Sequence, residues 1–215
     1  MVRLLSIGIE CLSSIIFILP AMVILRYTLW KPYGFGKRFM VFLFAIYAIA
    51  VFSAVGMPTA YDLQVNFNFH LIPLIDIFHG SMEYVRNTIL NVLLFMPMGF
   101  LLPVIWQEYH SAKKTIWMGL AASTIIELSQ IFTFRLTDID DLLTNTLGTF
   151  LGYHCGKKII FKLPVVSINA KDASIKHEAM LVLGAVFLIA FFLKPLVSNA
   201  VWDLVLSSPL WESVK

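Results

Sequence analysis

The chain contains long runs of apolar residues that a water-soluble fold could not cover. Short polar stretches separate six such runs, which span residues 4–25, 39–57, 88–106, 115–134, 142–156 and 179–193. A helix that crosses a membrane needs about 20 mostly apolar residues. In lipid, only helices and closed barrels satisfy all of their backbone hydrogen bonds. Because the runs lack the alternation of barrel strands, we predict an all-α, polytopic integral membrane helix bundle with about six transmembrane helices.

The overall composition excludes a soluble enzyme and a disordered chain. Hydrophobic residues make up 59% of the 215 residues and charged residues 13%, whereas an ordinary soluble domain has roughly 25% charged residues. The net charge of +3 comes from bases that are scattered along the chain. We therefore expect membrane lipids as partners, no nucleic acid and no cofactor.

The basic residues are distributed unevenly between alternate loops. Eleven of the 16 Lys and Arg residues follow the first, third and fifth apolar runs. Loops rich in Lys and Arg stay in the cytoplasm, so the sequence predicts a multi-pass protein with both termini outside. We divide it into residues 1–57 with two helices, a core at 58–156, and 157–215. The core holds an outer loop and helices three to five, and the last part holds a basic cytoplasmic loop, the sixth helix and an outer tail.

Polar side chains recur at helical spacing inside three of the apolar runs. In the fourth run, Ser123, Glu127 and Gln130 are four and three residues apart, which places them on one helix face. Pairs spaced four apart stand at the starts of the third and fifth runs, Asn87 with Asn91 and Asp141 with Asn145, the first member of each pair directly preceding its run. Polar groups within a span are costly and need a reason. All of these lie near the predicted outer ends of their helices, where they would form either one polar pocket or one structural hydrogen-bond network.

Eight residues are our candidates for ligand binding at this level of the bundle. They are Asn87, Asn91, Glu127, Gln130, Arg135, Asp138, Asp141 and Asn145. The sequence has no phosphate-binding loop, serine elbow or paired-cysteine motif, so catalytic residues are unknown and the question of an enzyme stays open. We predict no metal site, because the His and Asp spacings match no specific ligand pattern.

Three stretches together resemble the VanZ-like family. They are NTILNVLLFMPMGFLLP at 87–103, STIIELSQ at 123–130 and RLTDIDDLLTNTLGTFLGY at 135–153. The resemblance makes 58–156 a VanZ-like core and places the eight candidates on motif positions of the family. It implies a bacterial cytoplasmic membrane protein of the cell envelope. The founding member of the family is associated with resistance to teicoplanin, a lipoglycopeptide that acts on wall precursors outside the membrane.

The residues and the resemblance together favour a binding or shielding function. The polar pocket would hold an amphiphilic or lipid-linked cell-envelope ligand at the outer leaflet, such as a lipid-linked cell-wall precursor or a lipoglycopeptide. Such binding would contribute to teicoplanin-type antibiotic resistance. Two other interpretations stay open at this point: a membrane enzyme that acts on a lipid-linked envelope substrate, with Glu127 as acid or base, and a proton-coupled transporter.

Overall fold

The computed structural model describes residues 2–63, 65, 69–70, 82–133, 137–160 and 175–208. Its long helices are α1 (Val2–Tyr27), α2 (Phe35–Val55), α3 (Met82–Ile105), α4 (Ala112–Gln130) and α5 (Ile139–Ile160). A short 3₁₀ turn, η2 (Gln107–Tyr109), joins α3 to α4. The last helical stretch is continuous and consists of α7 (Glu178–Leu188), the π-helical turn η3 (Ile189–Leu193) and α8 (Lys194–Leu206).

The predicted membrane helix bundle is confirmed, but the predicted count of about six spans is not. Among the described residues, four helical segments are long and apolar enough to cross a membrane: Leu5–Tyr27, Phe35–Val55, Met82–Ile105 and Glu178–Leu206. The fourth and fifth apolar runs also form helices, α4 and α5, yet neither meets this standard. The polar and glycine residues that mark these two helices in the sequence lower their hydropathy.

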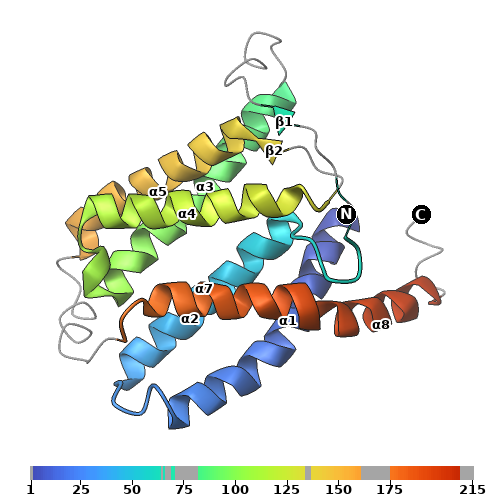
Figure 1. The fold of residues 1–215 in the computed structure, drawn as a ribbon, viewed down its shortest axis with the longest axis horizontal. Helices are drawn as coiled ribbons and strands as arrows, with labels where there is room; N and C mark the ends of the chain where they lie inside the picture. The colour runs from blue at the N-terminus through green and yellow to red at the C-terminus, as the bar shows by residue number, and fades with distance from the viewer. Residues whose placement is uncertain are drawn as a thin grey trace.

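The helices form two groups that meet at α2 (Figure 1). In one group, α5 packs along α3 and also contacts α4. In the other group, α1 contacts α2, η3 and α8. Helix α2 contacts both α3 and α7 and so connects the two groups.

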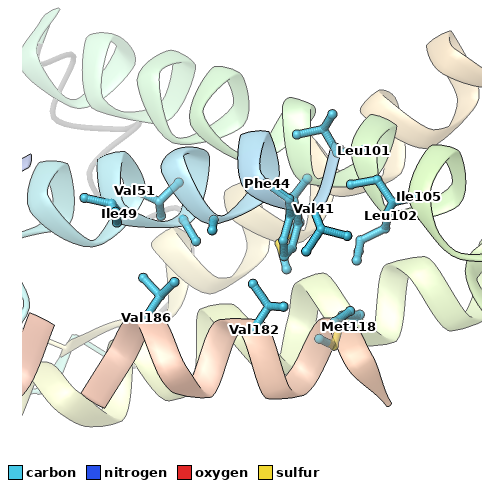
Figure 2. Packing of buried hydrophobic residues seen from close by; sticks show 14 of the residues in the cluster. Val41, Phe44, Ile49, Val51, Leu101, Leu102, Ile105, Met118, Val182 and Val186 are labelled. Atoms are coloured by element: carbon cyan, nitrogen blue, oxygen red, sulfur yellow. The ribbon is translucent and has the colours of Figure 1, made fainter. Parts of the chain in front are cut away.

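Apolar side chains fill the space between α2, α3 and α7 (Figure 2). Val41 and Phe44 of α2 and Leu102 of α3 have no exposed surface. The Phe44 ring meets the Trp106 ring edge-on, with centroids 5.0 Å apart. Because lipid is as apolar as these side chains, close packing rather than the hydrophobic effect holds such helices together.

The sequence at the end of α2 explains why this helix stops there. Gly56 adopts a left-handed conformation with φ of 69°, which glycine does at little cost. The Met57 N–H then donates to the Phe52 carbonyl at 3.2 Å, as in a Schellman motif. Pro58 follows and cannot continue the helix.

Glycines bring α3 and α5 into backbone contact. A Cβ atom on Gly99 of α3 would collide with the Thr149 carbonyl oxygen of α5. A Cβ atom on Gly148 or Gly152 of α5 would collide in the same way with the Val92 or Met96 carbonyl oxygen of α3. The glycines spaced four apart in the sequence therefore pack two helices of the same chain together.

Two short segments pair just before α5. Strand β1 (Phe69–His70) lies parallel to strand β2 (Thr137–Asp138), with Phe69 opposite Thr137 and His70 opposite Asp138. β2 runs directly into α5. This pairing holds the entry to α5 against a segment that precedes α3 in the chain.

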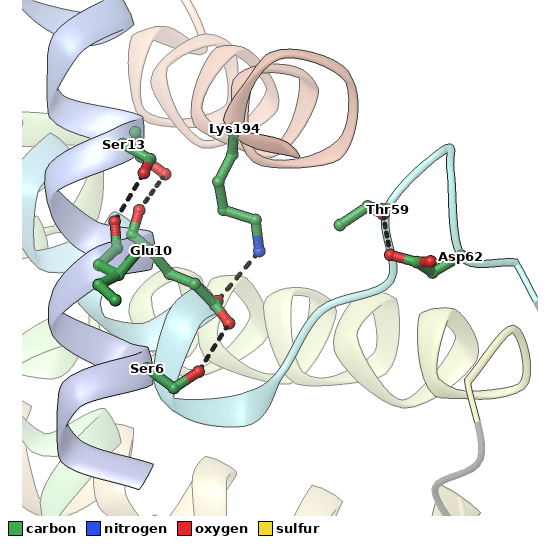
Figure 3. A network of polar contacts seen from close by, with 8 residues as sticks. Ser6, Glu10, Ser13, Thr59, Asp62 and Lys194 are labelled. Atoms are coloured by element: carbon green, nitrogen blue, oxygen red, sulfur yellow. Dashed lines mark hydrogen bonds and ion pairs between the residues drawn. The ribbon is translucent and has the colours of Figure 1, made fainter. Parts of the chain in front are cut away.

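Several helices extend past their apolar runs. Helix α3 begins at Met82, six residues before the run that starts at 88. The last helical stretch continues beyond 193, where the sixth run ends, through Lys194 and Pro195 to Leu206. Lys194 is tolerated inside it because its Nζ pairs with Glu10 Oε2 of α1 at 3.0 Å (Figure 3).

We predict that Gly152→Ala destabilises the protein by about 1–3 kcal/mol or more, because the new Cβ forces two backbones apart. Gly184→Ala is the matched control, since nothing lies within 4 Å of a Cβ at that helical position. It should be neutral or stabilise by up to ~1 kcal/mol, the difference in helix propensity between Gly and Ala. Unfolding of both variants in detergent micelles, followed by circular dichroism, measures the difference. Equal stabilities would contradict this packing.

Candidate functional site

The predicted polar level of the bundle lies where α3 and α5 begin and α4 ends (Figure 1). We call this region the polar end and define it by Asn91 of α3, Ser123, Glu127 and Gln130 of α4, and Asp138, Asp140, Asp141 and Asn145 at and after the start of α5. Hydrogen bonds between these residues join α5 to α3 and join α5 to α4.

Two hydrogen bonds join α3 to α5. The Asn91 Nδ2 donates to Asp141 Oδ1 at 2.6 Å, and the Tyr84 hydroxyl donates to Asp140 Oδ2 at 3.0 Å. Asn91 and Asp141 are half-buried, and Asp140 is buried. The first bond is short and its acceptor is a carboxyl oxygen.

A buried hydrogen bond joins α5 to α4. The Asn145 Nδ2 donates to Ser123 Oγ at 3.0 Å, and the two residues are 3% and 0% exposed. One turn further along α5, the Thr149 side chain occupies the space that a Cβ on Gly119 of α4 would need. The small residue at 119 and the short side chain of Ser123 therefore let α4 lie close to α5.

The start of α5 is fixed by carboxylates. Asp138 precedes the helix, and its Oδ1 accepts the Asp140 N–H at 2.9 Å, the usual hydrogen bond of an N-cap aspartate. The Asp138 N–H in turn donates to Glu127 Oε2 of α4 at 3.0 Å. Glu127 is 5% exposed, so this acid ties the backbone entering α5 to the buried face of α4. Asp140 and Asp141 in the first turn also interact favourably with the helix dipole.

Two buried amide oxygens at the polar end have no hydrogen-bond partner among the described residues. They are Gln130 Oε1 and Asn145 Oδ1, on residues 4% and 3% exposed. Most buried polar atoms in proteins are paired, and an unpaired one costs about 1–3 kcal/mol. These oxygens can accept hydrogen bonds from donors that the described part of the chain does not supply.

Two predicted site residues are not joined to the others. Asn87 is exposed on α3, and among described residues no hydrogen bond links it to the polar end. Arg135 lies outside the described residues. The remaining six candidates lie on the three helix ends as the helical spacing indicated.

The arrangement offers carboxylate and amide oxygens to a ligand. Within the described ranges, no three or more His, Cys, Asp or Glu side chains are grouped so as to hold a metal ion. The amide oxygens Gln130 Oε1 and Asn145 Oδ1 are the hydrogen-bond acceptors without a partner in the described part of the chain.

An apolar groove of about 320 Å³ lies elsewhere along the same pair of helices. Its lining consists of Met96, Pro97 and Phe100 of α3 and Gly152, Cys155 and Gly156 of α5. Gly152 and Gly156 have no side chains to fill the space beside the helix contact. The groove follows the part of α3 and α5 beyond the polar end.

Sequence reasoning missed a second buried polar cluster, at the opposite end of the bundle. Glu178 Oε2 of α7 accepts hydrogen bonds from Trp106 Nε1 at 2.7 Å and from the Tyr33 hydroxyl at 3.2 Å. Lys37 Nζ of α2 lies 4.0 Å from the same oxygen and 3.9 Å from the centre of the Tyr33 ring. All four residues are 1–2% exposed. The signal was present, since Lys37 and Glu178 sit at the starts of two apolar helices, but their pairing is long-range.

We predict that Ser123→Ala destabilises the protein by about 1–3 kcal/mol, because the buried Asn145 amide loses its acceptor. Asn87→Ala is the control, and a change at such an exposed site should stay within about 0.5 kcal/mol. Denaturant unfolding in micelles distinguishes the two. If Ser123→Ala unfolds like the wild-type chain, the hydrogen bond between α4 and α5 does not contribute to the fold.

Comparison with known proteins places these helices in a family. The family model described as VanZ/LLP1 matches residues 39–163, which include the described polar end. A protein of Enterococcus faecium named "Protein VanZ" is 32% identical over 118 residues, which cover 54% of this chain and 73% of that protein. No solved structure matches the chain. The extent of both matches shows that the chain belongs to the VanZ/LLP1 family.

Proposed function

We propose that the chain binds an amphiphilic or lipid-linked cell-envelope ligand at its polar end and contributes to resistance against teicoplanin-type glycopeptides. Membership of the VanZ/LLP1 family and the likeness to a protein named VanZ support the link to glycopeptide resistance. The ligand would be a lipid-linked wall precursor or the lipoglycopeptide itself. Binding at the polar end would keep the antibiotic and the wall precursor from contacting each other productively.

The observation that carries the proposal is the pair of buried, unpaired amide oxygens. Gln130 Oε1 and Asn145 Oδ1 lack partners in the described part of the chain, which costs stability. Peptide-containing ligands bring N–H and O–H donors that would pair with these oxygens. The unpaired oxygens destabilise the empty site, and hydrogen bonds from a bound ligand would remove that destabilisation.

An amphiphile also needs an apolar surface. The groove between α3 and α5 supplies one on the two helices that carry Asn91 and Asp141. The headgroup would meet the polar end and an acyl chain would lie along the apolar helices.

The distribution of basic residues supports the orientation that this ligand requires. Eleven of the 16 Lys and Arg residues follow the first, third and fifth apolar runs, which favours a cytoplasmic location for those loops. The polar end would then face the outer leaflet of the cytoplasmic membrane, with both chain termini outside. Wall precursors and glycopeptides meet on that side.

The test is a susceptibility measurement in a host that expresses the chain, with protein amounts checked by immunoblot. We expect wild type to raise the inhibitory concentration of teicoplanin selectively over that of vancomycin. Gln130→Leu should lower this protection, because losing a buried hydrogen bond of ~1 kcal/mol weakens binding by about fivefold. Asn199→Leu, at an exposed amide of α8, is the matched control and should protect like wild type.

The same variant separates a binding site from a structural network. Gln130→Leu removes an unpaired buried oxygen, so the folded protein should be as stable as wild type or more stable. A stable Gln130→Leu protein that still protects fully at equal expression would show that this amide does not bind the ligand. A wild-type chain that gives no protection would overturn the proposed link to glycopeptides.

A further inference from the structure

An ion pair lies inside two helices that are apolar enough to cross a membrane. Lys194 Nζ and Glu10 Oε2 are 3.0 Å apart, with side chains 5% and 23% exposed (Figure 3). Glu10 belongs to the segment Leu5–Tyr27 and Lys194 to the segment Glu178–Leu206. Ionisable groups at such positions are costly, and they persist where they pair with one another. The pair therefore fixes the position of the last helical stretch along α1.

The helix is irregular directly before this lysine. Residues Ile189–Leu193 form a π-helical turn, and the Lys194 N–H donates to the Ile189 carbonyl. Pro195 has no N–H, so the Phe191 carbonyl cannot receive the α-helical bond four residues on. It accepts instead the N–H of Ala60, at 3.0 Å. A backbone group of the last helix thereby holds the segment that follows α2.

That segment continues to the polar end. Three residues before Ala60, the Met57 sulfur lies 3.2 Å from Ser129 Oγ of α4. The Ser129 hydroxyl itself donates to the Ile126 carbonyl at 2.6 Å. Ser129 lies between Glu127 and Gln130 on α4. The segment is closed on its other side by a turn in which the Thr59 hydroxyl donates to Asp62 Oδ2 at 3.2 Å. Figure 3 shows this turn on the same side of α1 as Lys194.

We propose that the Glu10–Lys194 ion pair positions a neighbouring segment. The pair sets where the π-helical turn lies along α1, and the turn in turn holds the segment 57–62 against the end of α4. Glu10 and Lys194 act through the backbone hydrogen bond that the Ala60 N–H donates to the Phe191 carbonyl. Both residues lie outside the matched family region 39–163. The inference concerns the position of segment 57–62 and holds whatever ligand the polar end binds.

The test is a distance measurement on the full chain in lipid nanodiscs. Spin labels are placed on cysteines at Tyr61 and Leu128, which are 60% and 55% exposed. The native cysteines, Cys11 and Cys155, are replaced by alanine. Pulsed electron resonance then reports the distribution of distances between the segment and α4.

Breaking the pair should release the segment. Glu10→Gln and Lys194→Met should each broaden or shift the distance distribution, and the exchanged pair Glu10→Lys with Lys194→Glu should restore it. Arg86→Met is the control, because Arg86 pairs with Glu83 at the exposed surface of α3, 3.3 Å apart. That variant should leave the distances unchanged.

Two results would overturn the inference. One is an unchanged distribution in the folded Glu10→Gln and Lys194→Met proteins. The other is a disturbed distribution in the single variants that the exchanged pair fails to restore, which would show that attraction between these two charges is not what positions the segment. If one single variant fails to fold, the other and the exchanged pair still decide between these results.

Discussion

Backbone contact between α3 and α5 is the constraint on which the polar end depends. Gly99, Gly148 and Gly152 allow the two helices to approach until a carbonyl occupies the place of a Cβ. At ordinary interhelical distances of 8–10 Å, side chains would separate the helices. The Asn91–Asp141 bond joins the same two helices. The glycines thus determine how closely α3 and α5 approach, and polar side chains form hydrogen bonds between the two helices.

Polar interactions then fix the remaining helices around this pair. α4 is joined to α5 by the Ser123–Asn145 bond and by Glu127. The last helical stretch is held at its start by Glu178 near Lys37 and near its middle by Lys194 at Glu10. In lipid, where apolar surfaces gain little from meeting one another, such contacts decide which helices are neighbours. Buried carboxylates are costly alone, and Glu127, Glu178 and Glu10 each have at least one donor or cation beside one oxygen.

The sequence predicted what depends on local spacing and missed what depends on distant partners. Apolar runs indicated the helices, and spacings of three and four residues correctly grouped Glu127, Gln130, Asp141, Asn145 and Asn91 at one level. Asn87 shares the spacing but is exposed, because the first turns of α3, from Met82 to Leu90, are exposed or half-buried. Lys194 and Pro195 are typical of a helix end. Only a partner 184 residues away in the chain, Glu10, makes them part of a continuous helix.

Equilibrium binding to the purified chain in nanodiscs tests most directly whether the polar end is a ligand site. Fluorescently labelled teicoplanin and a labelled lipid-linked wall precursor are titrated against wild type and against Gln130→Leu. We predict saturable binding of at least one of them to wild type, and binding about fivefold weaker to the folded variant, as expected for one lost hydrogen bond. Equal affinity of both proteins for the bound ligand, or no saturable binding of either ligand to wild type, would contradict it.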